Sequence, residues 1–144
     1  MELRNTVHIA AQPDRVWDAL QDPAQLRAAL PMIKMLHQRP DGQIDMQVLV
    51  ELGYLRRILG AHLWIRKIEP GRVLQMDATL THRANGKCVV TLDPADGGTQ
   101  LTYDIESKVN LAGMTLGSFL VNRSARKMAE GFFDRLGKNL TAQG

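Results

Sequence analysis

An apolar stripe at helical spacing along residues 111–140 constrains this chain more than any other feature. At 100° per residue it stays on one face over about eight turns, or roughly 45 Å. The stripe consists of Leu111, Met114, Val121, Ala125, Met128, Ala129, Phe132, Phe133, Leu136 and Leu140. A helix of this kind must bury its stripe against a second layer. We therefore predict a curved sheet that holds a long C-terminal helix.

The sequence pattern before this helix predicts mostly strands. Alternation of apolar and polar residues predicts strands at 2–10, 32–39, 44–52, 57–68, 74–81, 88–92 and 101–109. Gln12-Pro13 and Asp22-Pro23 are typical of helix starts, so two short helices follow the first strand. Asn85-Gly86 predicts a hairpin turn, and Gly60 a bend within its strand. Short turns between successive strands imply a seven-stranded antiparallel meander, and hence an α+β fold.

Length and composition indicate one globular domain, residues 1–144. The chain is 44% hydrophobic and 23% charged, and no apolar run approaches the roughly 18 residues of a membrane span. The N-terminal segment lacks the apolar core of a secretory signal. A single cysteine, Cys88, excludes an internal disulfide, which favours a cytoplasmic location.

Asn5 lies on the apolar side of the first strand, as either a satisfied polar group at the sheet end or a polar contact in a pocket.

The net charge of +3 lies entirely in the C-terminal part. Residues 1–112 carry 13 basic and 13 acidic side chains, and residues 113–144 carry five basic against two acidic ones. These cations form either an ordinary solvated helix face or a surface that attracts anions.

The sequence contains no recognisable catalytic or metal-binding motif. None of His8, His37, His62 and His82 is spaced from another His or Cys as metal ligands are, so we expect no metal and no cofactor. Cys88 is expected to be a small core residue. His62 or His82 could serve as a general acid or base in a cavity, or be an ordinary hydrogen-bonded histidine. Aromatic residues make up 5% of the chain, which argues against nucleic acid binding.

The motifs resemble the G-subunit family of carbon monoxide dehydrogenase, within the helix-grip (START-like, SRPBCC) superfamily. The matching segments are Met1-Glu2-Leu3, PDRVWDAL at 13–20, Asp22-Pro23 with Leu26, Pro31, GGTQLTYD at 97–104, Leu116-Gly117-Ser118, ARKMA at 125–129 and Phe132-Phe133. The chain departs from the family pattern at Leu30-Pro31-Met32-Ile33, and it stops at Gly144 where some members carry a membrane-tethering extension. The resemblance implies a non-enzymatic accessory protein without a cofactor. Such a protein links a molybdenum hydroxylase such as carbon monoxide dehydrogenase to the membrane or quinone pool through a hydrophobic cavity.

A docking rim is predicted where three segments meet. In a meander, alternate turns share one sheet edge, which also holds the start of the long helix. Residues 52–68, 78–92 and 107–129 contain no Asp or Glu. Apolar residues backed by cations suit the surface of an anionic membrane, although the apolar ones could equally be core. The docking rim comprises Tyr54, Leu55, Arg56, Arg57, Leu116, Phe119, Leu120, Arg123 and Lys127.

The ligand cavity is predicted from residues that face inward. Its wall comprises Met46, Val48, Trp64, Met76, Leu80, Tyr103, Val121 and Met128. Methionines adapt to irregular apolar ligands but also fill ordinary cores. We therefore expect a cytoplasmic protein, peripheral at the inner face of the membrane, that binds a lipid or a quinone. The alternatives are a cyclase or hydrolase that uses a cavity histidine, and an assembly factor with a filled core.

Overall fold

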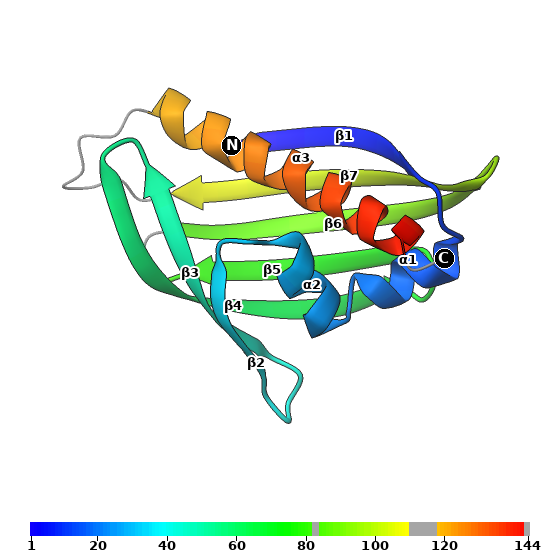
Figure 1. Cartoon of the computed structure of the whole chain (residues 1–144), viewed down its shortest axis with the longest axis horizontal. Helices are drawn as coiled ribbons and strands as arrows, with labels where there is room; N and C mark the ends of the chain where they lie inside the picture. Colours follow the sequence, from blue (N-terminus) through cyan, green and yellow to red (C-terminus); the bar gives the residue numbers. More distant parts are fainter. Residues whose placement is uncertain (82–83, 110–117, 143–144) are drawn as a thin grey trace.

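A seven-stranded antiparallel sheet curves along one side of a long helix in this computed structural model (Figure 1). The structure describes residues 1–81, 84–109 and 118–142, except for the side chains of Leu52, Leu55 and residues 118–121. The strands are β1 (Glu2–Ile9), β2 (Ile33–Gln38), β3 (Ile44–Leu52), β4 (Leu55–Glu69), β5 (Val73–Leu80), β6 (Ala84–Ala95) and β7 (Gly98–Val109). Their order is β1-β7-β6-β5-β4-β3-β2, so β1 and β2 form the two edges. The predicted fold class is confirmed.

Three helices lie on the concave face of this sheet. The short helices α1 (Pro13–Ala19) and α2 (Pro23–Ala29) connect the two edge strands, and both contact α3 (Ser118–Ala142). Asp22 caps α2 as predicted, because its side chain accepts a hydrogen bond from the Ala24 N–H at 2.9 Å. Arg135 Nε donates to the Ala29 carbonyl at 2.8 Å, and Arg15 Nη2 donates to the Leu140 carbonyl at 2.9 Å. The C-terminal half of α3 is thus fixed. None of the described helices is both long and apolar enough to cross a membrane.

The core lies where α3 crosses the sheet. Tyr103 of β7 stacks on Phe133 with ring centroids 4.3 Å apart, and Phe132 meets Phe133 edge-on at 4.9 Å. Such aromatic pairs add to the stabilisation that burial provides. Residues of the sheet, α1, α2 and α3 that are at most 2% exposed complete this core, and they include Val16, Leu20, Leu26, Ile44, Leu74, Val90, Leu101 and Leu136.

The predicted turn at Asn85-Gly86 is wrong. Both residues lie inside β6, where Asn85 pairs with Thr79 and Gly86 with Ala78. The chain reverses between Leu80 and Ala84 instead, and Thr81 has a positive φ of 50°. This register places Met76 opposite Cys88 and Leu74 opposite Val90 on the apolar face. Burial of these pairs therefore overrides the local turn preference of Asn-Gly.

Two further expectations concern irregularities and the start of the long helix. Gly60 pairs regularly with Gln47, and the register of β4 shifts at Lys67–Glu69 instead. The predicted helix began near Leu111, and the described part of α3 begins at Ser118. Residues 110–117 lie outside the described part of the chain. Within that part, α3 is the longest helix, with 25 residues.

Substitution of Gly98 by alanine is expected to lower the free energy of unfolding by about 2 kcal/mol. A Cβ atom at this position would lie 2.0 Å from the Ile9 carbonyl oxygen, so the β1–β7 contact would have to shift. Urea denaturation measures the effect. Gly60→Ala is the matched control because its Cβ would meet nothing within 4 Å, and a gain of roughly 0.5 kcal/mol is expected there. Equal changes in the free energy of unfolding for the two substitutions would contradict the close approach of Gly98 to the Ile9 carbonyl group.

Candidate functional site

The concave face of the sheet is buried at one end and only partly covered at the other. Toward α1 and α2, the inward residues Leu74, Val90 and Leu101 are fully buried. Toward the β3–β4 connection, the inward residues Val48 and Leu80 are only partly buried. This second half of the face is an apolar surface that an apolar molecule could cover, and we call it the open end.

The structure places five of the eight predicted cavity residues on one face of the sheet. Met46, Val48, Met76, Leu80 and Tyr103 share the concave face, as the strand register shows. Their burial rises from the open end inward: the first two and Leu80 are partly buried, whereas Met76 is 8% and Tyr103 0% exposed.

The other three predicted cavity residues are Trp64, Val121 and Met128. Met128 lies on α3, and its side chain is 46% exposed. The side chain of Val121 lies outside the described part. The placement of Trp64 in the cavity is wrong. Trp64 pairs with Asp77, on the face opposite to its neighbours Leu63 and Ile65, and is 39% exposed.

His62 also lies on this opposite, outer face, two residues before Trp64. Its Nδ1 donates a hydrogen bond to Asp45 Oδ1 at 2.7 Å, and Gln43 Nε2 donates to the same oxygen at 2.6 Å. These bonds, first that from His62 and then that from Gln43, lower the pKa of Asp45 below its ordinary value of 3.8. His62 therefore does not face the concave side, where the enzyme alternative required it, and His82 lies outside the described residues.

Replacing His62 by alanine is expected to raise the pKa of Asp45 toward 3.8, because the main hydrogen bond to the carboxylate is lost. Because the pKa of Asp45 is lowered in the folded protein, its ionised carboxylate stabilises the fold at pH values above the ordinary pKa. That stabilisation is lost as the pH falls through the lowered pKa. Carbon-13 NMR of the carboxyl group measures the titration. His37→Ala is the control, since His37 pairs with Asp45 in the register but does not contribute to its shift. An unchanged titration in His62→Ala would contradict this account.

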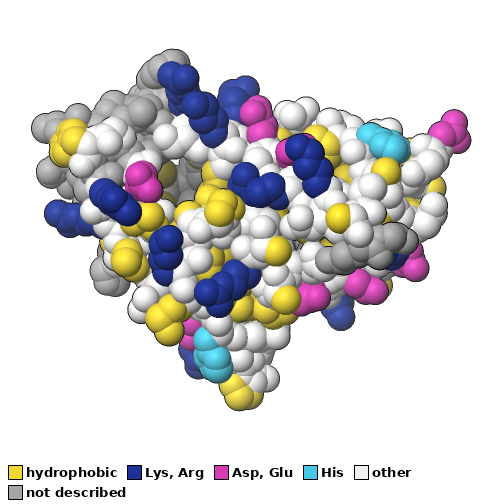
Figure 2. All heavy atoms as spheres, in the orientation of Figure 1, with side chains coloured by type: hydrophobic (Ala, Val, Ile, Leu, Met, Phe, Trp, Pro, Cys, Tyr) yellow, Lys and Arg dark blue, Asp and Glu magenta, His cyan; other side chains and the backbone are white. Residues whose placement is uncertain are grey.

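The predicted docking rim is described only in part. Tyr54 is 75% exposed, and Arg56, Arg57, Arg123 and Lys127 are exposed. Figure 2 shows Lys and Arg gathered over the half of the molecule that holds the β3–β4 connection and the start of α3, with hydrophobic side chains between them. The side chains of Leu55, Leu116, Phe119 and Leu120 lie outside the described part.

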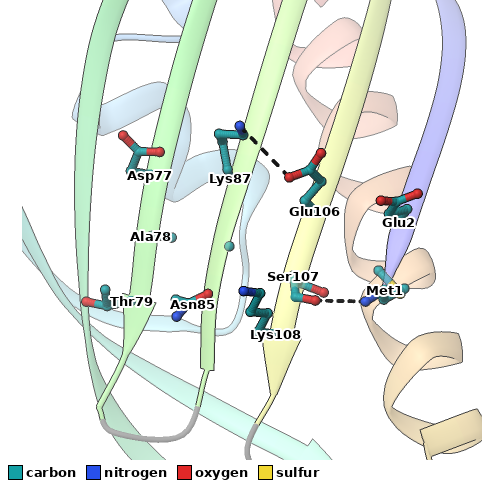
Figure 3. Close-up of a pocket in the computed structure, with 11 residues that line it drawn as sticks. Met1, Glu2, Asp77, Ala78, Thr79, Asn85, Lys87, Glu106, Ser107 and Lys108 are labelled. Carbon is teal, nitrogen blue, oxygen red and sulfur yellow. Dashed lines mark hydrogen bonds and ion pairs between the residues drawn. The ribbon is translucent and has the colours of Figure 1, made fainter.

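Two cations of the acid-free segments are not available for such a surface. Arg66 pairs with Asp77 at 2.9 Å. Lys87 pairs with Glu106 at 3.9 Å (Figure 3). Both pairs lie on the outer face. Asp77, Lys87 and Glu106 line a shallow depression of about 440 Å³ whose lining residues are mostly polar. By contrast, Arg56, Arg57, Arg123 and Lys127 form no ion pair with an acidic side chain of the described chain.

A groove of about 730 Å³ runs between the edge strand β1 and the C-terminal half of α3. Val7, Ile9, Tyr103 and Phe133 contribute its apolar lining, and Asn5 lies beside them. The Tyr103 hydroxyl is buried and has no hydrogen-bond partner among the described residues. Sequence reasoning missed the groove, although Asn5 on the apolar side of its strand was a signal for it.

Comparison with known proteins identifies a family by sequence and similar folds among solved structures. The model of the CoxG family, the G subunit of carbon monoxide dehydrogenase, matches residues 6–141. A conserved protein from Geobacillus kaustophilus is 18% identical, with a TM-score of 0.84, over 99% of this chain and 96% of its own. A START superfamily protein from Mycobacterium smegmatis is 16% identical, with a TM-score of 0.75, over 99% of both chains. No curated protein matches by sequence.

Proposed function

This chain belongs to the G-subunit family of carbon monoxide dehydrogenase, and from that premise we propose that it binds a hydrophobic ligand, a lipid or a quinone, between the sheet and α3. The observation that carries the proposal is the open end of the concave face. Met46 and Val48 of β3 and Leu80 of β5 point inward yet are only partly buried. Covering such apolar surface is favourable by roughly 25 cal/mol per Å².

Filling the concave space is expected to abolish ligand binding. Ala78 lies on the concave face beside Leu80 and is partly buried, so Ala78→Trp would occupy the space of the ligand. Thr79→Trp is the matched control, because the adjacent side chain points to the outer face. Titration with the fluorescent apolar dye Nile red measures affinity, and circular dichroism confirms the fold of each variant.

We expect at least a tenfold loss of dye affinity in Ala78→Trp, or about 1.4 kcal/mol, and little change in Thr79→Trp. Equal affinity of both folded variants would contradict a site on the concave face.

The docking rim is proposed to bring this ligand site to an anionic membrane. Its described cations are exposed and lie toward the same end of the sheet as the partly buried apolar residues. Flotation with vesicles tests the apolar half of the rim: binding that survives Leu116→Asp combined with Phe119→Asp would exclude that half.

The partner proposed from the family is a molybdenum hydroxylase such as carbon monoxide dehydrogenase. A carrier that extracts or delivers a quinone or lipid would connect such an enzyme with the membrane. Co-purification of a molybdenum hydroxylase with the tagged chain would support this partner, and a tagged chain that recovers no such enzyme from cells that express it would contradict it.

A further inference from the structure

The groove between β1 and α3 is open because β1 is an edge strand with α3 close to only part of it. The two elements approach at Gly137, where a Cβ would lie 3.6 Å from an Ile9 methylene carbon. Beyond this point the groove is lined by Val7, Phe133 and Tyr103. Its volume of about 730 Å³ falls within the range of small-molecule sites. The groove is thus large enough for part of a ligand and apolar along its walls.

An unsatisfied donor lies in this lining. Tyr103 is 0% exposed, and its hydroxyl oxygen has no hydrogen-bond partner among the described residues. Buried hydroxyl groups nearly always have a partner, so an unpaired one indicates a missing acceptor.

A second donor lies next to Tyr103. Asn5 is its direct neighbour across the β1–β7 pair, so both side chains stand on the concave face. Asn5 Oδ1 accepts a hydrogen bond from the Thr6 N–H at 2.8 Å. The Asn5 amide N–H groups make no hydrogen bond to another described residue, and they are therefore available as donors.

The charges of the groove restrict what these donors could bind. Glu130, Asp134 and Lys138 line it from α3, and His8 lines it from β1. Asp134 is paired with Lys138 at 3.0 Å, whereas Glu130 has no ion-pair partner in the described chain. A ligand with a carboxylate or phosphate head would meet this negative charge, and like charges in apposition are unfavourable.

We propose that the β1–α3 groove binds the uncharged, carbonyl-bearing head of a hydrophobic ligand. The Tyr103 hydroxyl and the Asn5 amide donate hydrogen bonds to the carbonyl oxygen, and Glu130 disfavours anionic heads. The inference rests on the proposed function, since the head belongs to the same hydrophobic ligand, and it adds the position and chemical class of that head.

Two probes of equal chain length test the selectivity: 2-hexadecanone, labelled with carbon-13 at its carbonyl, and hexadecanoate. NMR titration gives both affinities, and the carbonyl resonance of the ketone reports hydrogen bonding. We expect the ketone to bind at least tenfold more tightly than the carboxylate. Tyr103→Phe and Asn5→Ala should each weaken ketone binding about tenfold and shift the carbonyl resonance upfield. Glu130→Gln should tighten binding of hexadecanoate and leave the ketone unchanged.

Thr102→Val is the control for the tyrosine, because the adjacent residue points to the outer face and should not affect either probe. Tyr103→Phe also has a readout without ligand. Its Tm should equal or exceed that of the wild type, because the hydroxyl has no partner to lose. A Tm that falls by several degrees would show that the hydroxyl already has a structural partner, and would overturn the inference.

The inference and the proposed function can fail separately. If the ketone binds and Ala78→Trp prevents it, but Tyr103→Phe and Asn5→Ala have no effect, the groove is the wrong site and the proposed function stands. Preferential binding of hexadecanoate would overturn the assigned chemical class. If neither these probes nor Nile red binds the wild-type chain, both proposals fail.

Discussion

A variant with four charge reversals on the docking rim, Arg56→Glu, Arg57→Glu, Arg123→Glu and Lys127→Glu, is expected to lose about 1,000-fold in affinity for anionic vesicles. Each cation near an anionic lipid surface contributes about 1 kcal/mol, so four contribute roughly 4 kcal/mol, which corresponds to about three powers of ten. Co-sedimentation with vesicles of phosphatidylcholine and phosphatidylglycerol measures the affinity. Binding of the wild type should weaken as salt is added, because exposed charges are screened.

The control carries the same total charge change at other exposed positions, Arg4→Glu, Lys34→Glu, Arg39→Glu and Lys138→Glu. It should retain most of the binding, since only the position of the charges differs. A comparable loss in both variants would show that net charge alone drives association. Undiminished binding of the rim variant would exclude these four cations from the membrane contact.

Phe133→Ala is expected to lower the free energy of unfolding by about 3–5 kcal/mol, the range for removal of a buried aromatic ring. Phe133 is 3% exposed, stacks on Tyr103 and contacts Phe132 edge-on, so its loss leaves a cavity between α3 and the sheet. Urea denaturation followed by circular dichroism gives the value.

Met128→Ala on the same helix is the comparison for this prediction. Met128 is 46% exposed, and a loss below about 1 kcal/mol is expected for a side chain that is not packed in the core. Similar losses of unfolding free energy at both positions would contradict the conclusion that the C-terminal half of α3 packs in the core.

The fold could be predicted because each of its parts has its own periodicity. The helical repeat of Ala129, Phe132, Phe133, Leu136 and Leu140 predicted the face of α3 that the structure buries. Alternation along Ile44–Leu52 and Val73–Leu80 predicted β3 and β5 at nearly their observed bounds. Short connections then left an antiparallel meander as the simplest arrangement.

The errors occurred where a local pattern did not determine which face a residue occupies. β4 is apolar on both faces, so its sequence gave no basis for deciding whether Trp64 or Leu63 points inward. The register with Ile44 decides it, because it brings Leu63 to the concave face. Asn85-Gly86 illustrates the same limit, since burial of neighbouring strands determines the register and the turn adapts to it.

The candidate site was predictable only where it follows strand alternation. Met46, Val48, Met76, Leu80 and Tyr103 lie on one face as expected. The β1–α3 groove depends on how closely a helix approaches an edge strand, and no periodicity in the sequence reports that distance. The unpaired hydroxyl of Tyr103 is likewise a property of the packed structure.

Native mass spectrometry of the protein purified from its own host tests the central claim most directly, because it detects a molecule held between the sheet and α3 without assuming its identity. We expect a non-polar small molecule to co-purify with the wild-type chain and to be absent from Ala78→Trp, while Thr79→Trp retains it. A wild-type spectrum that shows only the mass of the bare chain, or a molecule retained equally by Ala78→Trp, would contradict the account.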